Sequence, residues 1–378
     1  MEKGMEEGSV SPCNIRAFSP CNVQQEFERI EPSKKRRFKW FLLILNCLLT
    51  GMGTTGGPLL LRLYYLHGGQ RQWATSWLQT AGFPLLLIPL SVLCIRDRAR
   101  GVPFMAEPKL LMYSAGIGLL VGLDNFMYSH GLSFLPVSTS ALLFSTQLAF
   151  TAFFAFLIVK QRFSPYSVNA VVLMTLGAVL LGVRKSGDRP ASVSSGEYLV
   201  GFLLTLGAAL LLGFIFPSIE FAYSKATKTL THSVVLQFQL GVTFFATVFC
   251  TVGMLVNGDF QAMGREARSF GLGEAKYYVV VVAAAVVFQM EFVGWLGVVF
   301  CASSFFAGVL GAVLLPITEI AAVIAFDEKF TPEKGMSLAL CLWGFTSYFY
   351  GAYQSQKKAK AADQGGAENQ QPAAAQNV

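Results

Sequence analysis

Residues 197–219 read EYLVGFLLTLGAALLLGFIFPSI, and no charged side chain follows Glu197 in this stretch. An α-helix needs about 20 apolar residues to cross about 30 Å of hydrocarbon. Lipid offers no partners to backbone N–H and C=O groups, so a segment of this kind must satisfy them within itself, as a helix does. The stretch therefore predicts a membrane-spanning helix.

Nine further apolar runs predict a membrane protein of ten transmembrane helices. The chain is 53% hydrophobic and 13% charged, and this charged share is about half that of a soluble domain. None of the runs alternates as the strands of a membrane barrel do, so the predicted fold class is all-α. The ten predicted spans are residues 40–63, 73–95, 109–130, 135–158, 167–184, 197–219, 233–256, 277–300, 304–326 and 334–353.

The basic residues predict the orientation of the chain in the bilayer. The formal net charge is +7, and a basic run, KKRRFK, occupies residues 34–39 just before the first span. Lys and Arg concentrate on the cytosolic side of membrane proteins, and the count over both tails and the loops places both termini in the cytosol. The positive charge is therefore explained by contact with the lipid bilayer, and we expect no nucleic-acid partner. Residues 1–39 and 354–378 are predicted to be disordered cytosolic segments.

The chemistry-bearing side chains predict neither a metal site nor an enzyme. Seven cysteines are scattered singly, and His67, His130 and His232 lie apart near predicted helix ends. No C-x-x-C pair, H-E-x-x-H motif or nucleophile–base constellation is present. We therefore expect no cofactor, no metal and no enzymatic activity.

A short internal repeat divides the predicted helices into two halves. Residues 160–165 (KQRFSP) align with residues 327–332 (DEKFTP) at a shift of 167 positions, and Gly177 then falls on Gly344. Five helices per half is an odd number, so the second half enters the membrane from the opposite side. This predicts an inverted repeat, the arrangement that secondary transporters use for alternating access. The predicted halves are residues 40–184 and 197–353, joined by a linker at 185–196.

Several segments of the chain resemble the plant purine permeases of the drug/metabolite transporter superfamily. The segments are GGPLLLRLYY (56–65), WLQTAG (77–82), STQLAFTA (145–152), LLPITE (314–319) and LWGFTSYFYG (342–351). The resemblance implies proton-driven uptake of purine bases, cytokinins or related nitrogen heterocycles across the plasma membrane. Glu291, in the run FQME (288–291), departs from the family pattern.

Three carboxyl groups lie well inside predicted spans: Asp124, Glu291 and Glu319. An ionisable group at the centre of a helix costs about 2.5–3.5 kcal/mol on insertion scales, so such groups face a cavity and mark a pathway. A carboxyl that alternates between its charged and neutral forms is suited to proton coupling. Each of the three could instead be a neutral packing group with a hydrogen-bond partner.

Four side chains are candidates for binding the solute: Trp77, Asn125, Tyr128 and Gln147. An amide can both donate to and accept from the edge of a purine, and an aromatic ring can stack on its face. Asn125 and Tyr128 are three residues apart and share a helix face. Gln147 could instead bridge two helices, and Trp77 could anchor its helix at the membrane interface.

Gly53, Gly57 and Pro58 predict a closely packed and bent first helix, which could act as a gate. No Lys or Arg lies near the centre of a predicted span, so a nucleotide-sugar carrier, which must neutralise phosphates, is disfavoured. Two alternatives remain open: an alkaloid or vitamin carrier with the same cavity, and a ligand-sensing membrane protein without transport. The residues do not indicate an oligomeric state.

Overall fold

The computed structural model describes residues 33–99, 108–144, 146–161, 163–182, 193–226, 232–326, 330 and 332–368. Regular structure in these residues is helical throughout, so the predicted all-α class is confirmed. The helices are α2 (Ser33–Leu66), α3 (Gln72–Ala81), the 3-10 helix η1 (Phe83–Leu86), α4 (Leu87–Ala99), α5 (Pro108–Phe134), α6 (Val137–Phe144), α7 (Gln147–Ile158), α8 (Pro165–Gly182), α9 (Ser195–Ala226), α10 (His232–Asn257), α11 (Asp259–Ser269), α12 (Glu274–Cys301), α13 (Ser304–Phe326) and α14 (Pro332–Glu368).

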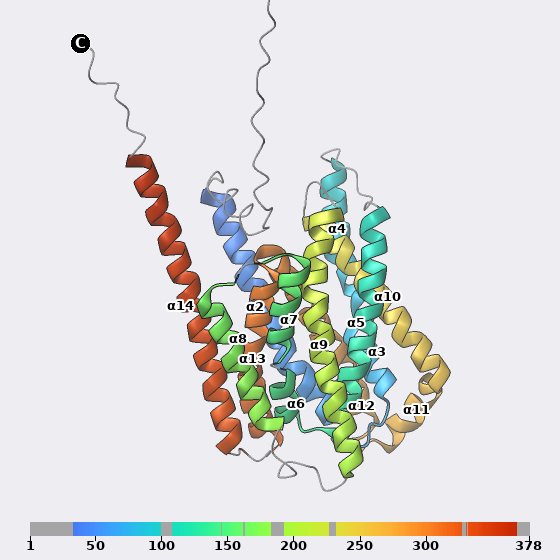
Figure 1. Cartoon of the computed structure of the whole chain (residues 1–378). Helices are drawn as coiled ribbons and strands as arrows, with labels where there is room; N and C mark the ends of the chain where they lie inside the picture. The colour runs from blue at the N-terminus through green and yellow to red at the C-terminus, as the bar shows by residue number, and fades with distance from the viewer. Residues whose placement is uncertain are drawn as a thin grey trace, which may run out of the picture.

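Among the described residues, five helices are long and apolar enough to cross a membrane: α2, α5, α9, α10 and α12. Each of them contains one predicted span. Figure 1 shows the helices as a bundle, with the start of α2 and the end of α14 at the same end. The last helix, α14, continues past the predicted end of its span to Glu368. Residues 1–32 and 369–378, most of the two predicted tails, lie outside the described part.

The second predicted span, residues 73–95, is not one continuous helix. It is divided into α3, η1 and α4, with Gly82 between the first two and Pro84 within η1. A proline has no N–H to donate to the preceding turn, so it favours a break. Gly82 also lies so close to α12 that an added Cβ would come within 2.6 Å of the Ala285 carbonyl oxygen. The single-helix prediction is therefore corrected here by a proline and by contact with another helix.

The fourth predicted span, residues 135–158, is also divided. Helix α6 ends at Phe144 and α7 begins at Gln147, and the placement of Ser145 lies outside the described residues. The Thr146 hydroxyl donates to the Leu143 carbonyl at 2.8 Å, so it bonds back to the last turn of α6. The break puts Gln147 in the first turn of α7 rather than in the middle of a helix.

Helix α11 forms where the sequence analysis expects a loop between the seventh and eighth spans. Gly258 (φ 69°) and Gly273 (φ 92°) flank it, and both adopt left-handed backbone conformations that favour glycine. Figure 1 shows α11 at the end of the bundle opposite to the start of α2. Because α11 is short and half polar, it does not form an apolar run of the length that predicts a span.

A cluster of polar side chains fastens α11 to the bundle. Arg71 lies 3.6 Å from both Asp259 and Glu266, measured from guanidinium nitrogen to carboxylate oxygen. Glu266 also accepts hydrogen bonds from the hydroxyl groups of Tyr64 and Tyr277. Both carboxylates are buried. We call these five residues the α11 cluster.

Glycines allow close contact between α2 and α12, the pair that carries most of the central site. A Cβ at Gly53 would overlap the backbone of Glu291, and one at Gly294 would overlap Thr50. Small residues at such positions let membrane helices approach closely enough for van der Waals contact. The close contact of Gly53 with α12 agrees with the close packing predicted for the first helix.

Candidate functional site

A cavity lies at the centre of the bundle between α2, α5, α9 and α12. Its volume is about 100 Å³, several times the roughly 10–15 Å³ that a single water needs. Its lining is mostly apolar with a few polar groups, as is typical of small-molecule sites. The lining residues are Thr54, Pro58, Gln79, Val121, Asp124, Asn125, Tyr128, Phe144, Leu212, Ile215, Phe216, Ile219, Phe288, Glu291, Phe292, Trp295, Leu296 and Thr318.

Two adjacent residues of α5 present polar atoms that no protein group satisfies. Asp124 and Asn125 line the cavity and are each 7% exposed. Within the described part of the chain, Asp124 Oδ1 and Asn125 Nδ2 have no hydrogen-bond partner. Buried polar atoms are normally paired, because an unpaired one costs about 1–3 kcal/mol. Asp124 thus has an acceptor, and Asn125 a donor, that a solute with a donor and an acceptor could pair with.

The carboxyl of Glu291, on α12, has partners. Its Oε1 accepts a hydrogen bond from the Thr54 hydroxyl at 2.8 Å and from the Trp295 indole N–H at 3.2 Å. Thr54 lies on α2, so the first of these bonds joins two helices. Asp124 and Glu291 line the same cavity, and the described residues of that lining include no Lys, Arg or His. The structure thus brings together two of the three predicted carboxyls.

The third predicted carboxyl, Glu319, lies on α13, but its side chain lies outside the described residues. Its neighbour Thr318 lines the cavity. No group of three or more potential metal ligands occurs in the described part of the chain.

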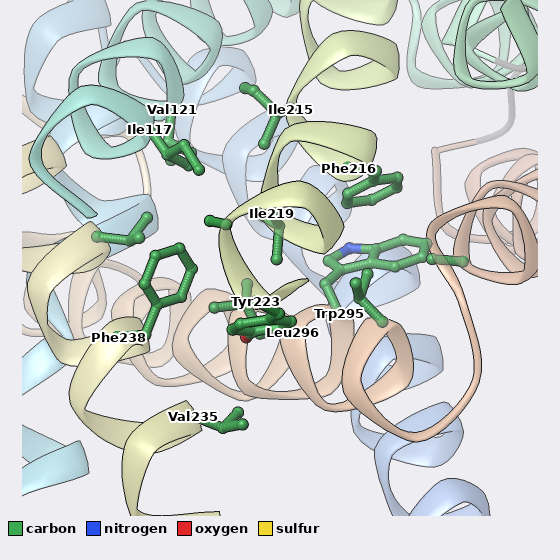
Figure 2. Packing of buried hydrophobic residues seen from close by; sticks show 14 of the residues in the cluster. Ile117, Val121, Ile215, Phe216, Ile219, Tyr223, Val235, Phe238, Trp295 and Leu296 are labelled. Atoms are coloured by element: carbon green, nitrogen blue, oxygen red, sulfur yellow. The ribbon is translucent and has the colours of Figure 1, made fainter. Parts of the chain in front are cut away.

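Aromatic and aliphatic side chains from α5, α9 and α12 form the apolar side of the cavity. Figure 2 shows Phe216 beside the indole of Trp295, with ring centroids 5.1 Å apart. Ile215 and Ile219 of α9, also labelled there, line the cavity. A flat heterocycle can be buried against such a surface with favourable aromatic contacts.

Trp295, rather than the predicted Trp77, is the tryptophan at the cavity. The Trp77 indole N–H donates to the Thr251 hydroxyl at 3.0 Å, and its ring packs edge-on against Phe260. Trp77 is absent from the cavity lining. The face of a helix that turns inward depends on its neighbours, and the residue type alone does not reveal it.

Gln147 is buried beside the cavity. Its Nε2 has no hydrogen-bond partner among the described residues. A Cβ on Gly311 would lie 3.6 Å from Gln147 Oε1 and 3.1 Å from Trp295 Cη2, so the two side chains approach the same glycine. Tyr128, the fourth predicted binding residue, lines the cavity, and its ring packs on Phe144 at 5.1 Å.

Gln79 is a cavity residue that the sequence analysis did not select. Its side-chain amide donates to Ser129 Oγ at 2.7 Å and to the Asn125 carbonyl at 3.2 Å. These bonds join α3 to α5 next to the unpaired Asn125 amide. The resemblance could have pointed to Gln79, because the residue lies within the stretch WLQTAG.

The predicted gate residues lie along one side of α2. Pro58 lines the cavity, and a Cβ at Gly57 would meet the Phe288 ring of α12. Because Pro58 has no N–H, the Thr54 carbonyl has no helical partner. The Thr318 hydroxyl of α13 donates to that carbonyl at 3.2 Å. A side chain from another helix therefore pairs with the carbonyl that Pro58 leaves without a helical partner.

Comparisons with known proteins decide the family. A family profile described as purine nucleobase transmembrane transport matches residues 41–358. Purine permease 3 of Arabidopsis thaliana is 47% identical over 320 residues, which cover 83% of this chain and 91% of the relative. The chain belongs to the purine permease family.

Other purine permeases extend the same result. Purine permease 2 of Arabidopsis thaliana is 46% identical over 344 residues, covering 86% of this chain and 96% of the relative. Probable purine permease 5 of the same plant is 36% identical over 323 residues, covering 85% and 89%. The resemblance drawn from the sequence is confirmed, and the family is one of multi-pass membrane transporters rather than enzymes.

Proposed function

We propose that this purine permease is a proton-coupled secondary active transporter that takes up purine bases, cytokinins or related nitrogen heterocycles by alternating access. One observation carries the proposal: an apolar, aromatic cavity at the centre of the bundle that contains two carboxyls and an unpaired acceptor–donor pair. Burying a flat, neutral or protonated heterocycle there would satisfy atoms that the protein leaves unpaired. The described part of the lining has no Lys, Arg or His, and this disfavours phosphorylated solutes.

The contact between α8 and α14 supports two inverted halves of ten transmembrane helices in all. A shift of 167 positions takes Ala170 to Ser337 and Gly177 to Gly344. A Cβ at Gly177 would lie 3.1 Å from the Ser337 carbonyl oxygen, and one at Gly344 would lie 3.0 Å from that of Ala170. Exchanging the halves turns each contact into the other. These contacts mean that α8 and α14 run antiparallel. A two-fold axis that relates antiparallel helices lies perpendicular to them, as an inverted repeat requires.

A second pair of contacts obeys the same shift. It takes Gly122 to Gln289 and Gly82 to Phe249. Gly122 of α5 lies against Phe249 of α10, and Gly82 lies against Gln289 of α12. This supports halves at residues 40–184 and 197–353 with a linker at 185–196. Helices from both halves line the cavity, which suits alternating access by one half moving against the other.

The position of the chain ends supports cytosolic termini. Figure 1 shows the start of α2 and the end of α14 at one end of the bundle, as an even number of spans requires. The basic run at residues 34–39 then assigns that end to the cytosol. We propose the plasma membrane as the location.

The experiment is uptake of radiolabelled adenine into cells that carry the protein at their surface. We expect uptake to rise when the outside is made acidic, to fall with a protonophore, and to be blocked by unlabelled purines and cytokinins. Surface labelling controls for expression. If uptake ignores both pH and protonophore, proton coupling is wrong. If adenine is not taken up, the same assay with alkaloids and vitamins tests the alternative solutes.

A further inference from the structure

The two carboxyls of the cavity occupy related positions, but their surroundings differ. The shift of 167 positions takes Asp124 of α5 to Glu291 of α12. Glu291 accepts hydrogen bonds from Thr54 and Trp295, whereas Asp124 Oδ1 has no partner in the part of the chain that the structure describes. Both carboxyls are held at the cavity wall by long helices. One is therefore committed to the protein and the other is available to a solute.

The difference arises from the helix that lies opposite each carboxyl. Helices α2 and α9 both contain an internal proline, Pro58 and Pro217, and these are 159 positions apart. The α9 residues that line the cavity are Leu212, Ile215, Phe216 and Ile219, and none of them carries a hydroxyl group. Thr54 of α2 therefore gives Glu291 a hydroxyl partner that has no counterpart among the described α9 residues of the lining.

Thr54 connects Glu291 to the bend in α2. Its hydroxyl donates to Glu291 Oε1, and its carbonyl, left without a helical partner by Pro58, accepts from Thr318 of α13. A hydrogen bond to an ionised carboxylate is about twice as strong as one to a neutral acceptor. Protonation of Glu291 therefore weakens the hydrogen bond from Thr54, which lies in the turn of α2 before Pro58. A ligand shifts a conformational equilibrium only through such a difference between states, and a bound proton supplies one here.

We infer that the two carboxyls divide the work: Glu291 carries the coupled proton and transmits its binding to the bend at Pro58, while Asp124, with Asn125, binds the solute. The solute class is a heterocycle whose edge carries an N–H donor beside a ring-nitrogen acceptor. This inference rests on the proposed transport function. It assigns separate roles to groups that sequence analysis could only treat as equivalent.

The groups that face Glu291 allow this assignment. Across the cavity α5 presents Asp124 and Tyr128, the titratable groups among the described lining residues. The other helices that meet the cavity beside Glu291 present Thr54 from α2, aliphatic and aromatic side chains from α9, and Thr318 from α13. The described lining residues include no Lys, Arg or His that would hold Glu291 in its charged form, so it can exchange its proton with the medium whenever the cavity opens.

The test uses the full chain, reconstituted in proteoliposomes, with labelled adenine as the probe. Counterflow, the exchange of labelled for unlabelled adenine without a proton gradient, measures solute binding and movement. Accumulation under an imposed gradient, acidic outside, measures coupling. Wild-type protein must show both activities. If it shows neither, the proposed function fails; if it shows both, the variants below judge the division of roles alone.

Glu291→Gln keeps an oxygen that accepts from Thr54 and Trp295 but cannot carry a proton. We expect its counterflow half-saturation to stay within about threefold of wild type, because the change leaves hydrogen-bonding capacity in place. Its accumulation should fall to the equilibrium level. Continued gradient-driven accumulation by Glu291→Gln overturns the inference.

Asp124→Asn should produce the opposite result. We expect a half-saturation concentration about tenfold higher, because the Asn amide oxygen accepts as a neutral group and a hydrogen bond to an ionised acceptor is about twice as strong. At saturating adenine, uptake should still be driven by the proton gradient. If Asp124→Asn instead abolishes coupling and leaves affinity intact, the roles are reversed and the inference is wrong.

A pair of variants at Thr54 keeps the test decisive if Glu291→Gln fails to fold. Thr54→Val has the same shape without the hydroxyl, whereas Thr54→Ser keeps it. We expect Thr54→Val to retain counterflow and lose most gradient-driven accumulation, and Thr54→Ser to behave as wild type. Equal accumulation by the two variants would show that the Thr54–Glu291 bond does not transmit the proton's effect. Surface density and gel-filtration profile control for folding.

Discussion

The α11 cluster and the central cavity each contain two buried or half-buried carboxyl groups, and they differ in their counterion. Asp259 and Glu266 share Arg71, and each also accepts a hydrogen bond. Asp124 and Glu291 share a cavity in which no cation occurs among the lining residues that the structure describes. A buried carboxylate with a fixed cation is part of the scaffold, because the pair is costly to break. One without a cation is left to bind something that comes and goes, such as a proton or a solute.

The largest effect should come from removing the fixed counterion. Arg71→Ala leaves two buried carboxylates without a cation, which typically costs about 3–5 kcal/mol. We expect the lower end of this range, because the Arg71 side chain is 33% exposed. The measurement is thermal unfolding of the detergent-solubilised protein. Arg265→Ala, an exposed position on α11, is the matched control. Equal unfolding temperatures for the two variants would remove the distinction between the cluster and the cavity.

A smaller loss of stability should follow when the wall of the cavity is overpacked. A Cβ from Gly53→Ala would overlap the backbone of Glu291, which cannot rotate away as a side-chain end can. Overpacking of this kind costs about 1–3 kcal/mol. Gly116→Ala in α5, where a Cβ would meet nothing within 4 Å, is the control and should be neutral or slightly stabilising. Unfolding curves and adenine uptake of the two variants decide the matter.

Two tryptophans distinguish the binding residue predicted from the sequence, Trp77, from the one that the fold places at the cavity, Trp295. Trp295→Phe removes part of the aromatic surface that lines the cavity beside Phe216, together with the indole donor to Glu291. We expect its half-saturation concentration for adenine to rise about fivefold, as for about 1 kcal/mol of lost interaction. Trp77→Phe removes a bond to Thr251 away from the cavity, so its half-saturation should stay near wild type. The reverse order of effects would restore Trp77 as the binding residue.

The smallest effect on stability is expected at an atom that has no hydrogen-bond partner within the described part of the chain. Asn125→Ala removes a side-chain amide nitrogen that has no partner among the described residues. The folded state should lose little stability, whereas adenine should bind about two- to tenfold more weakly, the range for one neutral hydrogen bond. Binding to purified protein, measured beside its unfolding temperature, separates the two. A drop in stability without a change in affinity would make Asn125 a structural residue.

The sequence alone determines the class of this protein because the decisive quantities are local. Whether about 20 residues can satisfy their own backbone in lipid depends on those residues only. The same holds for the position of Asp124 and Glu291 inside apolar runs, which made both residues candidates for proton coupling before any fold was known. The family resemblance also resides in short stretches that need no tertiary structure.

Only the tertiary structure decided which of these side chains meet. The division of the second span reflects Pro84 together with the approach of Gly82 to α12, and the second of these is a contact between distant parts of the chain. Trp77 and Trp295 are equivalent by residue type, and the rotation of each helix about its axis placed the second at the cavity. Neighbouring helices set that rotation through their packing, so no window of sequence contains it.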